Sequence, residues 1–323
     1  MDKVKNQENY VILEDVKRGK SIPWKEKKIK SLKVSDSFKR LKYIKKSNRI
    51  KYCGSYLEFI KNIETNEKKL YSANFCKERL CPMCQWRKSL KVFHQVSRIM
   101  DKVQKERKNL IPLFLTLTLK NCTGSNLSST LDNIFQSWYK LVKYRKIKRI
   151  VKGWFRTLEI TYNKKNDTFH PHIHSIIMVD KNYFKKNNKD YMQTSDWVNI
   201  WRKALNINYD PICDIRKIKN NKKKYKAMSE VAKYTLKDTD FIFDDIYLTD
   251  KVIGVLNCCL KGRRLYALGG VLKQIAKEIK ISNLSEGDLV HIDEEKIRED
   301  VSSVIELYHW NFGFTNYVKI DID

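Results

Sequence analysis

The sequence lacks long hydrophobic runs. No apolar stretch approaches the roughly 20 residues that a membrane-spanning helix needs. The first ten residues, MDKVKNQENY, lack the apolar core of a secretory signal, and no internal repeat of useful length occurs. These absences predict a cytoplasmic protein without a membrane partner. In that reducing compartment, the eight cysteines are expected to be thiols or metal ligands rather than disulfides.

Acidic residues are also scarce. The 323 residues include 66 lysines and arginines but only 37 aspartates and glutamates, which gives a formal net charge of +29. Such an excess would repel itself without a polyanionic partner, so it predicts nucleic-acid binding. The last 43 residues are acidic, so the positive charge is concentrated in the first 280. With 42% hydrophobic residues, the chain is long enough for one large domain with appendages or for two domains.

Three of the six histidines lie within five residues, at His170, His172 and His174, and lead into an apolar stretch. In a strand, residues two apart point to the same face, so His172 and His174 project side by side. Two imidazoles that converge from one strand can hold a divalent metal. The alternative is a surface cluster with incidental spacing. His170, where the strand begins, is expected to be a spare ligand or a DNA contact.

The strand predicted at residues 154–162 suggests a third ligand. It should pair antiparallel with the histidine strand, because the connecting loop is short. If Glu159 lies opposite His174, the turn centres near residues 166 and 167, and all three side chains share one face. Two histidines and one carboxylate leave open positions for phosphate oxygens and suit Mn²⁺ or Mg²⁺. This register, and with it the third ligand, is a hypothesis.

Glu230 and Tyr234 lie four residues apart in a predicted helix, so they share one face. A phenol titrates near 10, and a metal that polarises the scissile phosphate would make it an effective nucleophile. Attack would give a 5′-phosphotyrosyl link and a free 3′-OH. Glu230 could activate water or a 3′-OH for a second cleavage, while Lys237 neutralises phosphate charge. The alternative role for Tyr234 is a packed aromatic side chain.

Cys76, Cys81 and Cys84 are separated by four and two residues, with a proline inside the second spacing. This pattern is typical of a structural Zn²⁺ site with four protein ligands. Cys53 is the first choice for the fourth ligand and His94 the second. The alternative to a zinc site is that these cysteines are buried thiols with no metal-binding or redox role. The remaining cysteines show no partner pattern and are expected in the core: Cys122, Cys213, Cys258 and Cys259.

Four segments resemble motifs of rolling-circle plasmid replication initiators, members of the His-hydrophobe-His (HUH) endonuclease superfamily. Residues 114–118 (FLTLT) resemble the first motif, residues 169–174 (FHPHIH) the second, and residues 230–237 (EVAKYTLK) the tyrosine-bearing third. Residues 75–84 (FCKERLCPMC) are similar to the cysteine segment of initiators on small Gram-positive plasmids. The resemblance covers roughly residues 50–280, in the family's order.

The resemblance implies an α+β fold, with a central antiparallel β-sheet flanked by helices and a small N-terminal zinc-binding module. Together with composition it predicts four parts of the chain. They are a basic flexible segment (1–45), a zinc-binding cysteine module with a helix (46–108), the endonuclease catalytic domain (109–280) and an acidic C-terminal segment (281–323).

The implied activity is a site-specific nick in one strand at the double-strand origin of plasmid DNA, followed by cleavage and rejoining at termination. By motif position, Tyr234 is the nucleophile, Glu230 the termination carboxylate, and His172 and His174 the metal ligands. Glu159 is carried over as the third ligand, whose position varies among relatives. The implied partners are the origin and its single-stranded nick site, with host helicase, polymerase and a second copy of the chain as further possibilities.

Two other functions remain open. A relaxase or transposase would use the same chemistry, but relaxases usually carry the tyrosine before the histidines, and such transposases are shorter. A non-catalytic zinc-containing DNA-binding regulator would explain the charge and the cysteines but leave the histidine strand unexplained. DNA contacts are expected from the basic helix predicted at residues 130–150, with Trp138, Tyr139 and Tyr144 as stacking candidates, and from the lysines at 217–226.

Overall fold

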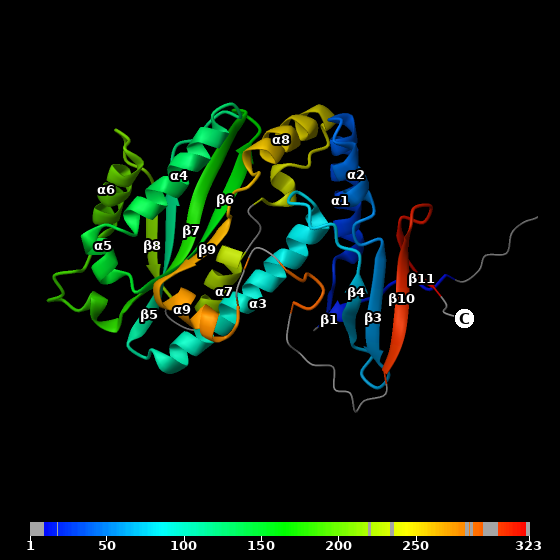
Figure 1. Cartoon of the computed structure of the whole chain (residues 1–323), viewed down its shortest axis with the longest axis horizontal. Coiled ribbons are helices and arrows are strands. Elements are labelled where there is room, and N and C mark those ends of the chain that lie inside the picture. The colour runs from blue at the N-terminus through cyan, green and yellow to red at the C-terminus, as the bar shows by residue number, and fades with distance from the viewer. Residues whose placement is uncertain are drawn as a thin grey trace, which may run out of the picture. The chain divides into compact units, whose positions relative to one another are not determined.

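Antiparallel sheets form the centre of both parts of the molecule, as the computed structural model in Figure 1 shows. The structure describes residues 10–17, 19–218, 221–232, 236–281, 284, 287–292 and 303–320, with only the backbone described at 221–226. The chain divides into two units. We call Lys88–Gly287 the histidine unit, and Met1–Arg87 with Asp288–Asp323 the cysteine unit.

The histidine unit is built on a five-stranded sheet in the order β8-β5-β7-β6-β9, with every pairing antiparallel. Its strands are β5 (Leu110–Thr118), β6 (Gly153–Asn163), β7 (Thr168–Asp180), β8 (Cys213–Lys217) and β9 (Tyr266–Gly269). The central strand β7 is rich in isoleucine, and Ile173, Ile176 and Ile177 are buried. β-branched side chains pack well on such a surface, which explains why this segment occupies the centre of the sheet.

Helices cover both faces of this sheet. They are α3 (Pro82–Glu106), which begins in the cysteine unit, α4 (Leu127–Leu141), α5 (Arg145–Ile150), α6 (Thr194–Leu205), α7 (Asn221–Ala232), α8 (Ile246–Cys259) and α9 (Gly270–Glu278), with 3₁₀ turns η1 (Lys181–Phe184) and η2 (Asp238–Asp240). Figure 1 shows α4 and α6 on one side and α7 and α9 on the other. The predicted α+β class with a helix-flanked antiparallel sheet is confirmed. Within the described ranges, none of the helices combines the length and apolar character needed to cross a bilayer.

The β6–β7 hairpin sets the register of the histidine strand. Glu159 lies opposite His172, and Thr157 lies opposite His174. The predicted pairing of Glu159 with His174 is therefore wrong by two residues. The reason lies in the turn, where the Asn163 side chain accepts hydrogen bonds from the backbone N–H groups of residues 165 and 166. This closes the loop one residue earlier than predicted, and a shift of two positions leaves Glu159 on the histidine face.

The cysteine unit contains a four-stranded antiparallel sheet in the order β11-β10-β3-β4. Its elements are the β1–β2 hairpin (Val16–Lys17 and Lys20–Ser21), α1 (Trp24–Arg40), α2 (Ile44–Lys51), β3 (Tyr56–Asn62), β4 (Lys68–Ala73), β10 (Ser303–Asn311) and β11 (Asn316–Ile320). The two C-terminal strands complete this sheet, because β10 pairs along the whole of β3.

These elements differ from the expected flexible N-terminal segment and acidic C-terminal segment. Much of residues 1–45 is helical, and α1 packs Trp24, Val34 and Phe38 into the core. From residue 303 the acidic segment is a hairpin in which Tyr308 and Trp310 are buried. Composition alone concealed both elements, because basic side chains surround the apolar positions of α1, and the acidic residues that flank the hairpin dominate the composition of its segment.

Glu306 on β10 is a buried acid surrounded by lysines. Its carboxylate lies 3.0 Å from Lys68 Nζ, 3.5 Å from Lys319 Nζ and 3.6 Å from Lys61 Nζ. It also accepts a hydrogen bond of 2.9 Å from the Tyr308 hydroxyl. Burial alone would raise the pKa of Glu306, but the Lys68 and Tyr308 hydrogen bonds and the lysine charges lower it to about 2. The three lysines therefore stabilise the ionised form in the folded state.

Glu306→Gln should destabilise the chain by about 3 kcal/mol at neutral pH, because it leaves three lysines around an uncharged amide. A lowered folded-state pKa gives stability that is complete above the unfolded value, near 4.5, and is lost as pH falls toward about 2. The difference between the wild type and Glu306→Gln in urea unfolding should therefore shrink across this range. Exposed Glu64→Gln is the control. A difference independent of pH would contradict this account.

Candidate metal centres

His172, His174 and Glu159 converge on the sheet of the histidine unit. Their ligand atoms all lie within 4.8 Å of one another. Oε2 of Glu159 lies 3.3 Å from His172 Nε2 and 2.8 Å from His174 Nε2. Donor atoms around one octahedral ion at about 2.1 Å lie about 3 Å apart. The spacing and chemistry of this donor set therefore fit a divalent cation that accepts nitrogen and oxygen ligands.

The other ring nitrogens of both histidines have partners that favour this arrangement. His172 Nδ1 lies 3.1 Å from the His170 carbonyl oxygen, which can only accept, so Nδ1 carries the proton. A neutral His172 ring then leaves a lone pair on Nε2. His174 Nδ1 lies 3.1 Å from the Thr116 hydroxyl on β5. Such outer contacts fix the ring orientation of metal-binding histidines.

Lys237 contacts the second oxygen of Glu159. Its Nζ lies 2.9 Å from Oε1, and its side chain is 47% exposed. Burial alone would raise the pKa of Glu159, but the close contacts of its carboxylate with His172, His174 and Lys237 outweigh burial and hold that pKa far below its ordinary value. The same contact with Glu159 raises the pKa of Lys237. The carboxylate is thus ionised and a strong acceptor.

The predicted catalytic helix corresponds to α7, which packs against β6 and β7. Glu230 lies near its end, and its charge acts on both Lys237 and Arg216. Tyr234 lies outside the described residues.

Sequence reasoning missed Asp240, whose carboxylate accepts the Lys237 backbone N–H at 3.1 Å and also bonds to the backbone of β6. An acid three residues after Lys237 is the spacing of a capping box, which could have revealed it.

Among the residues that the structure describes, His170 does not belong to the ligand group. Its ring lies 5.2 Å from that of His172, and burial lowers the pKa of His170.

Of the stacking candidates, Trp138 is only 3% exposed, so the prediction that it stacks on DNA is wrong. Tyr139 is 60% exposed, with Lys143 Nζ 3.8 Å from its ring centre.

The second donor group consists of Cys53, Cys76, Cys81 and Cys84. The Cys84 sulfur lies 3.4 Å from that of Cys53 and 3.7 Å from that of Cys76. Sulfurs on one tetrahedral zinc at 2.3 Å lie about 3.8 Å apart, so the group fits Zn²⁺. Backbone N–H groups of residues 76, 77 and 78 donate to these sulfurs. The group contains Cys53, the first choice for the fourth ligand, and does not contain His94.

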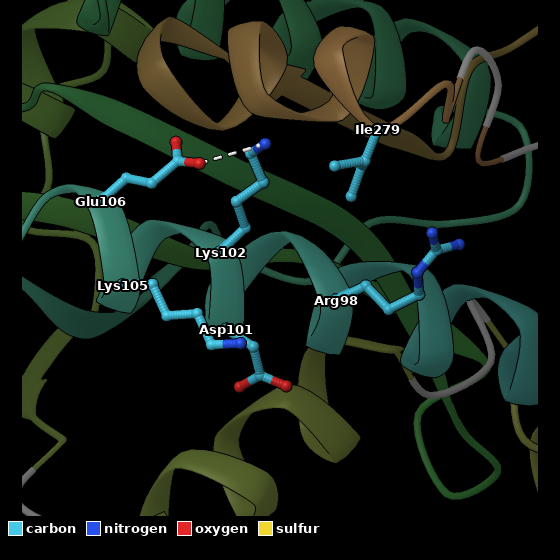
Figure 2. Close-up of a pocket in the computed structure, with 6 residues that line it drawn as sticks. All are labelled: Arg98, Asp101, Lys102, Lys105, Glu106 and Ile279. Carbon is cyan, nitrogen blue, oxygen red and sulfur yellow. Dashed lines mark ion pairs between the residues drawn. The ribbon is translucent and has the colours of Figure 1, made fainter.

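A pocket of about 400 Å³ lies elsewhere in the histidine unit. Its lining residues, drawn in Figure 2, are Arg98, Asp101, Lys102, Lys105, Glu106 and Ile279. Figure 2 shows Lys102 and Glu106 forming an ion pair along α3, with a separation of 3.1 Å. None of the candidate metal ligands lines this pocket.

The fold and the two donor groups define an α+β protein with two candidate metal centres. A family of proteins described as "Replication protein" matches residues 67–318. The chain is 35% identical to a "Protein rep" of Bacillus amyloliquefaciens, covering 97% of this chain and 98% of that protein. It is 37% identical to a "Protein rep" of Streptococcus pneumoniae serotype 2, covering 98% of each.

A "Replication protein" of Staphylococcus aureus is 36% identical over 67% of this chain and 94% of its own length. No solved structure matches the chain significantly. The chain belongs to this replication protein family, which confirms the resemblance that its motifs predict.

Removing one sulfur should release the metal of the cysteine group. We expect about one zinc per chain in the wild type by mass spectrometry of the purified protein, and loss of that zinc in Cys53→Ser, because a structural site needs all four ligands. His94→Ala and Cys258→Ser should retain zinc, since neither residue belongs to the group. Zinc retention in Cys53→Ser together with loss in His94→Ala would assign the fourth ligand to the histidine instead.

Thr116→Val should weaken Mn²⁺ binding at the histidine centre. Valine keeps the shape of threonine but removes the contact with His174 Nδ1, and loss of such an outer contact typically costs 10- to 100-fold in metal affinity. Calorimetric titration with Mn²⁺ measures the change. Thr118→Val is the matched control, because the Thr118 hydroxyl bonds to the Ile212 carbonyl rather than to an imidazole. Equal affinities in both variants would refute the role of Thr116.

Proposed function

We propose that this chain is a plasmid rolling-circle replication initiator that nicks one DNA strand at the double-strand origin and later cleaves and rejoins it. The observation that carries the proposal is the convergence of His172, His174 and Glu159 in a replication protein, on strands against which α7 packs. Glu230 and Lys237 flank the segment that contains Tyr234. The motif resemblance supports the same roles.

His172, His174 and Glu159 would hold Mn²⁺ or Mg²⁺. A bound ion there would polarise the scissile phosphate and stabilise the charge that develops during attack. Lys237 already lies beside Glu159 and is half exposed, so its ammonium group can also neutralise a phosphate oxygen. Asp240 holds the Lys237 backbone in place and is a positioning residue.

Tyr234 would be the nucleophile. In the sequence it stands three residues before Lys237, whose Nζ contacts Glu159. Its phenolic oxygen forms a bond to phosphorus while the bond from phosphorus to the 3′ oxygen breaks. The phenol proton leaves to water, and the 3′ oxygen takes up a proton and becomes the primer terminus. The phosphotyrosyl link conserves the phosphodiester energy, so rejoining needs no ATP.

Glu230 would serve termination. It lies on α7, which packs on the histidine strands, and its charge acts on Lys237. A carboxylate there can take the proton from water or from a 3′-OH in the second cleavage, which makes a second tyrosine unnecessary. The cysteine group would hold structural Zn²⁺ within the cysteine unit. The cytoplasmic location, the DNA partners, and the roles of helicase, polymerase and a homodimer belong to the same proposal.

Tyr234→Phe should abolish nicking of supercoiled origin plasmid in Mn²⁺, a loss of about a thousandfold or more, because phenylalanine has no attacking oxygen. Conversion to open circles on agarose gels and the covalent protein–oligonucleotide adduct on denaturing gels are the two measurements. Tyr247→Phe is the matched control, since Tyr247 is 87% exposed on α8 and belongs to neither donor group.

Two outcomes would overturn the proposed mechanism. One is an adduct that mass spectrometry maps to a side chain other than Tyr234, and the other is nicking that persists at full rate in EDTA. A wild type that binds origin DNA without ever opening it would favour the non-catalytic regulator instead.

A further inference from the structure

Lys28 is a fully buried lysine beside the cysteine group. It lies on α1, its exposed fraction is 0%, and its Nζ donates to the carbonyl oxygens of Lys51 at 2.7 Å and Cys53 at 2.8 Å. In the described part of the chain it forms no ion pair with a carboxylate. A buried ammonium group is costly unless an opposite charge compensates it.

Thiolates of the cysteine group would supply that opposite charge. The electrostatic partners of Lys28 are the thiols of Cys53, Cys81 and Cys76. Four thiolates around one Zn²⁺ leave a net charge of −2 within an apolar interior. A cation held next to this centre would offset part of that charge, and the centre would in turn offset the burial of Lys28.

A second side chain on α1 contacts the same group. The Ser31 hydroxyl lies 3.6 Å from the Cys81 sulfur and accepts the Met83 backbone N–H at 3.2 Å. Lys28 and Ser31 are one helical turn apart, so they share one face of α1. This face therefore supplies an outer layer for a site whose ligands all lie further along the chain.

We propose that Lys28 is the counter-cation of the cysteine centre, and that its positive charge strengthens zinc binding. This inference rests on the proposal that the four cysteines hold zinc. The competing role for Lys28 is purely structural. Lys51, whose carbonyl oxygen accepts from Lys28, is the last residue of α2, and a cation at a helix C-terminus satisfies the final carbonyls and complements the helix dipole. In that role Lys28 would stabilise the fold without changing the zinc affinity.

Lys28→Met and Lys28→Gln separate these roles in the full chain. Both remove the charge, and glutamine keeps a donor for a carbonyl oxygen. Transfer of zinc to a colorimetric chelator should show affinity lowered about tenfold or more in both variants, the scale for outer contacts of metal ligands. Lys33→Met, an exposed site on the same helix, should match the wild type. Circular dichroism establishes that each variant is folded.

Wild-type zinc affinity in Lys28→Gln would overturn the counter-cation role and leave the structural one. Wild-type protein that contains no zinc would overturn the zinc proposal itself, so the two failures are distinguishable. If neither variant is folded as purified, the zinc concentration needed for refolding from urea distinguishes the two roles of Lys28. We expect the variants to need at least about tenfold more zinc than the wild type, and an unchanged zinc requirement would refute the inference.

Discussion

The antiparallel pairing of β6 with β7 is the constraint on which the histidine centre depends. Side chains alternate along a strand, so a register shift of one residue would turn Glu159 into the core, whereas a shift of two keeps it beside His172 and His174. The side chain of Asn163 fixes this register by closing the turn. β5 then places Thr116 against His174, so ligands and outer contact come from three adjacent strands.

Local periodicity predicted most of this centre. Two histidines two residues apart, and threonines at alternate positions of residues 114–118, indicate side chains on one face of adjacent strands. The register between β6 and β7 could not be predicted from periodicity, because the length of a loop does not show which residue closes it. Asn163 closes the loop through its side chain, and this placed Glu159 opposite His172 instead of His174.

The cysteine unit was harder to predict, because its parts are distant in the sequence or polar. β10 joins β3 across about 240 residues, and no local pattern signals such a pairing. On β10 the buried side chain of Glu306 is acidic rather than apolar. Lysines on the neighbouring strands compensate its charge and make its burial possible. The periodicity of α1 is weak for a related reason. Its buried face includes Lys28 and Ser31, which a hydrophobic pattern does not count.

Exposure distinguishes the lysines at the two centres. Lys237 contacts Glu159 from a segment next to Tyr234 and remains 47% exposed, so a phosphate can compete for it. Lys28 is fully buried and donates to two backbone carbonyl oxygens, so groups from solvent cannot reach it. A catalytic metal must accept substrate ligands, whereas a structural metal keeps a closed set. The accessibility of each lysine therefore matches the role proposed for its centre, with an exposed lysine where DNA would bind and a buried lysine at the structural site.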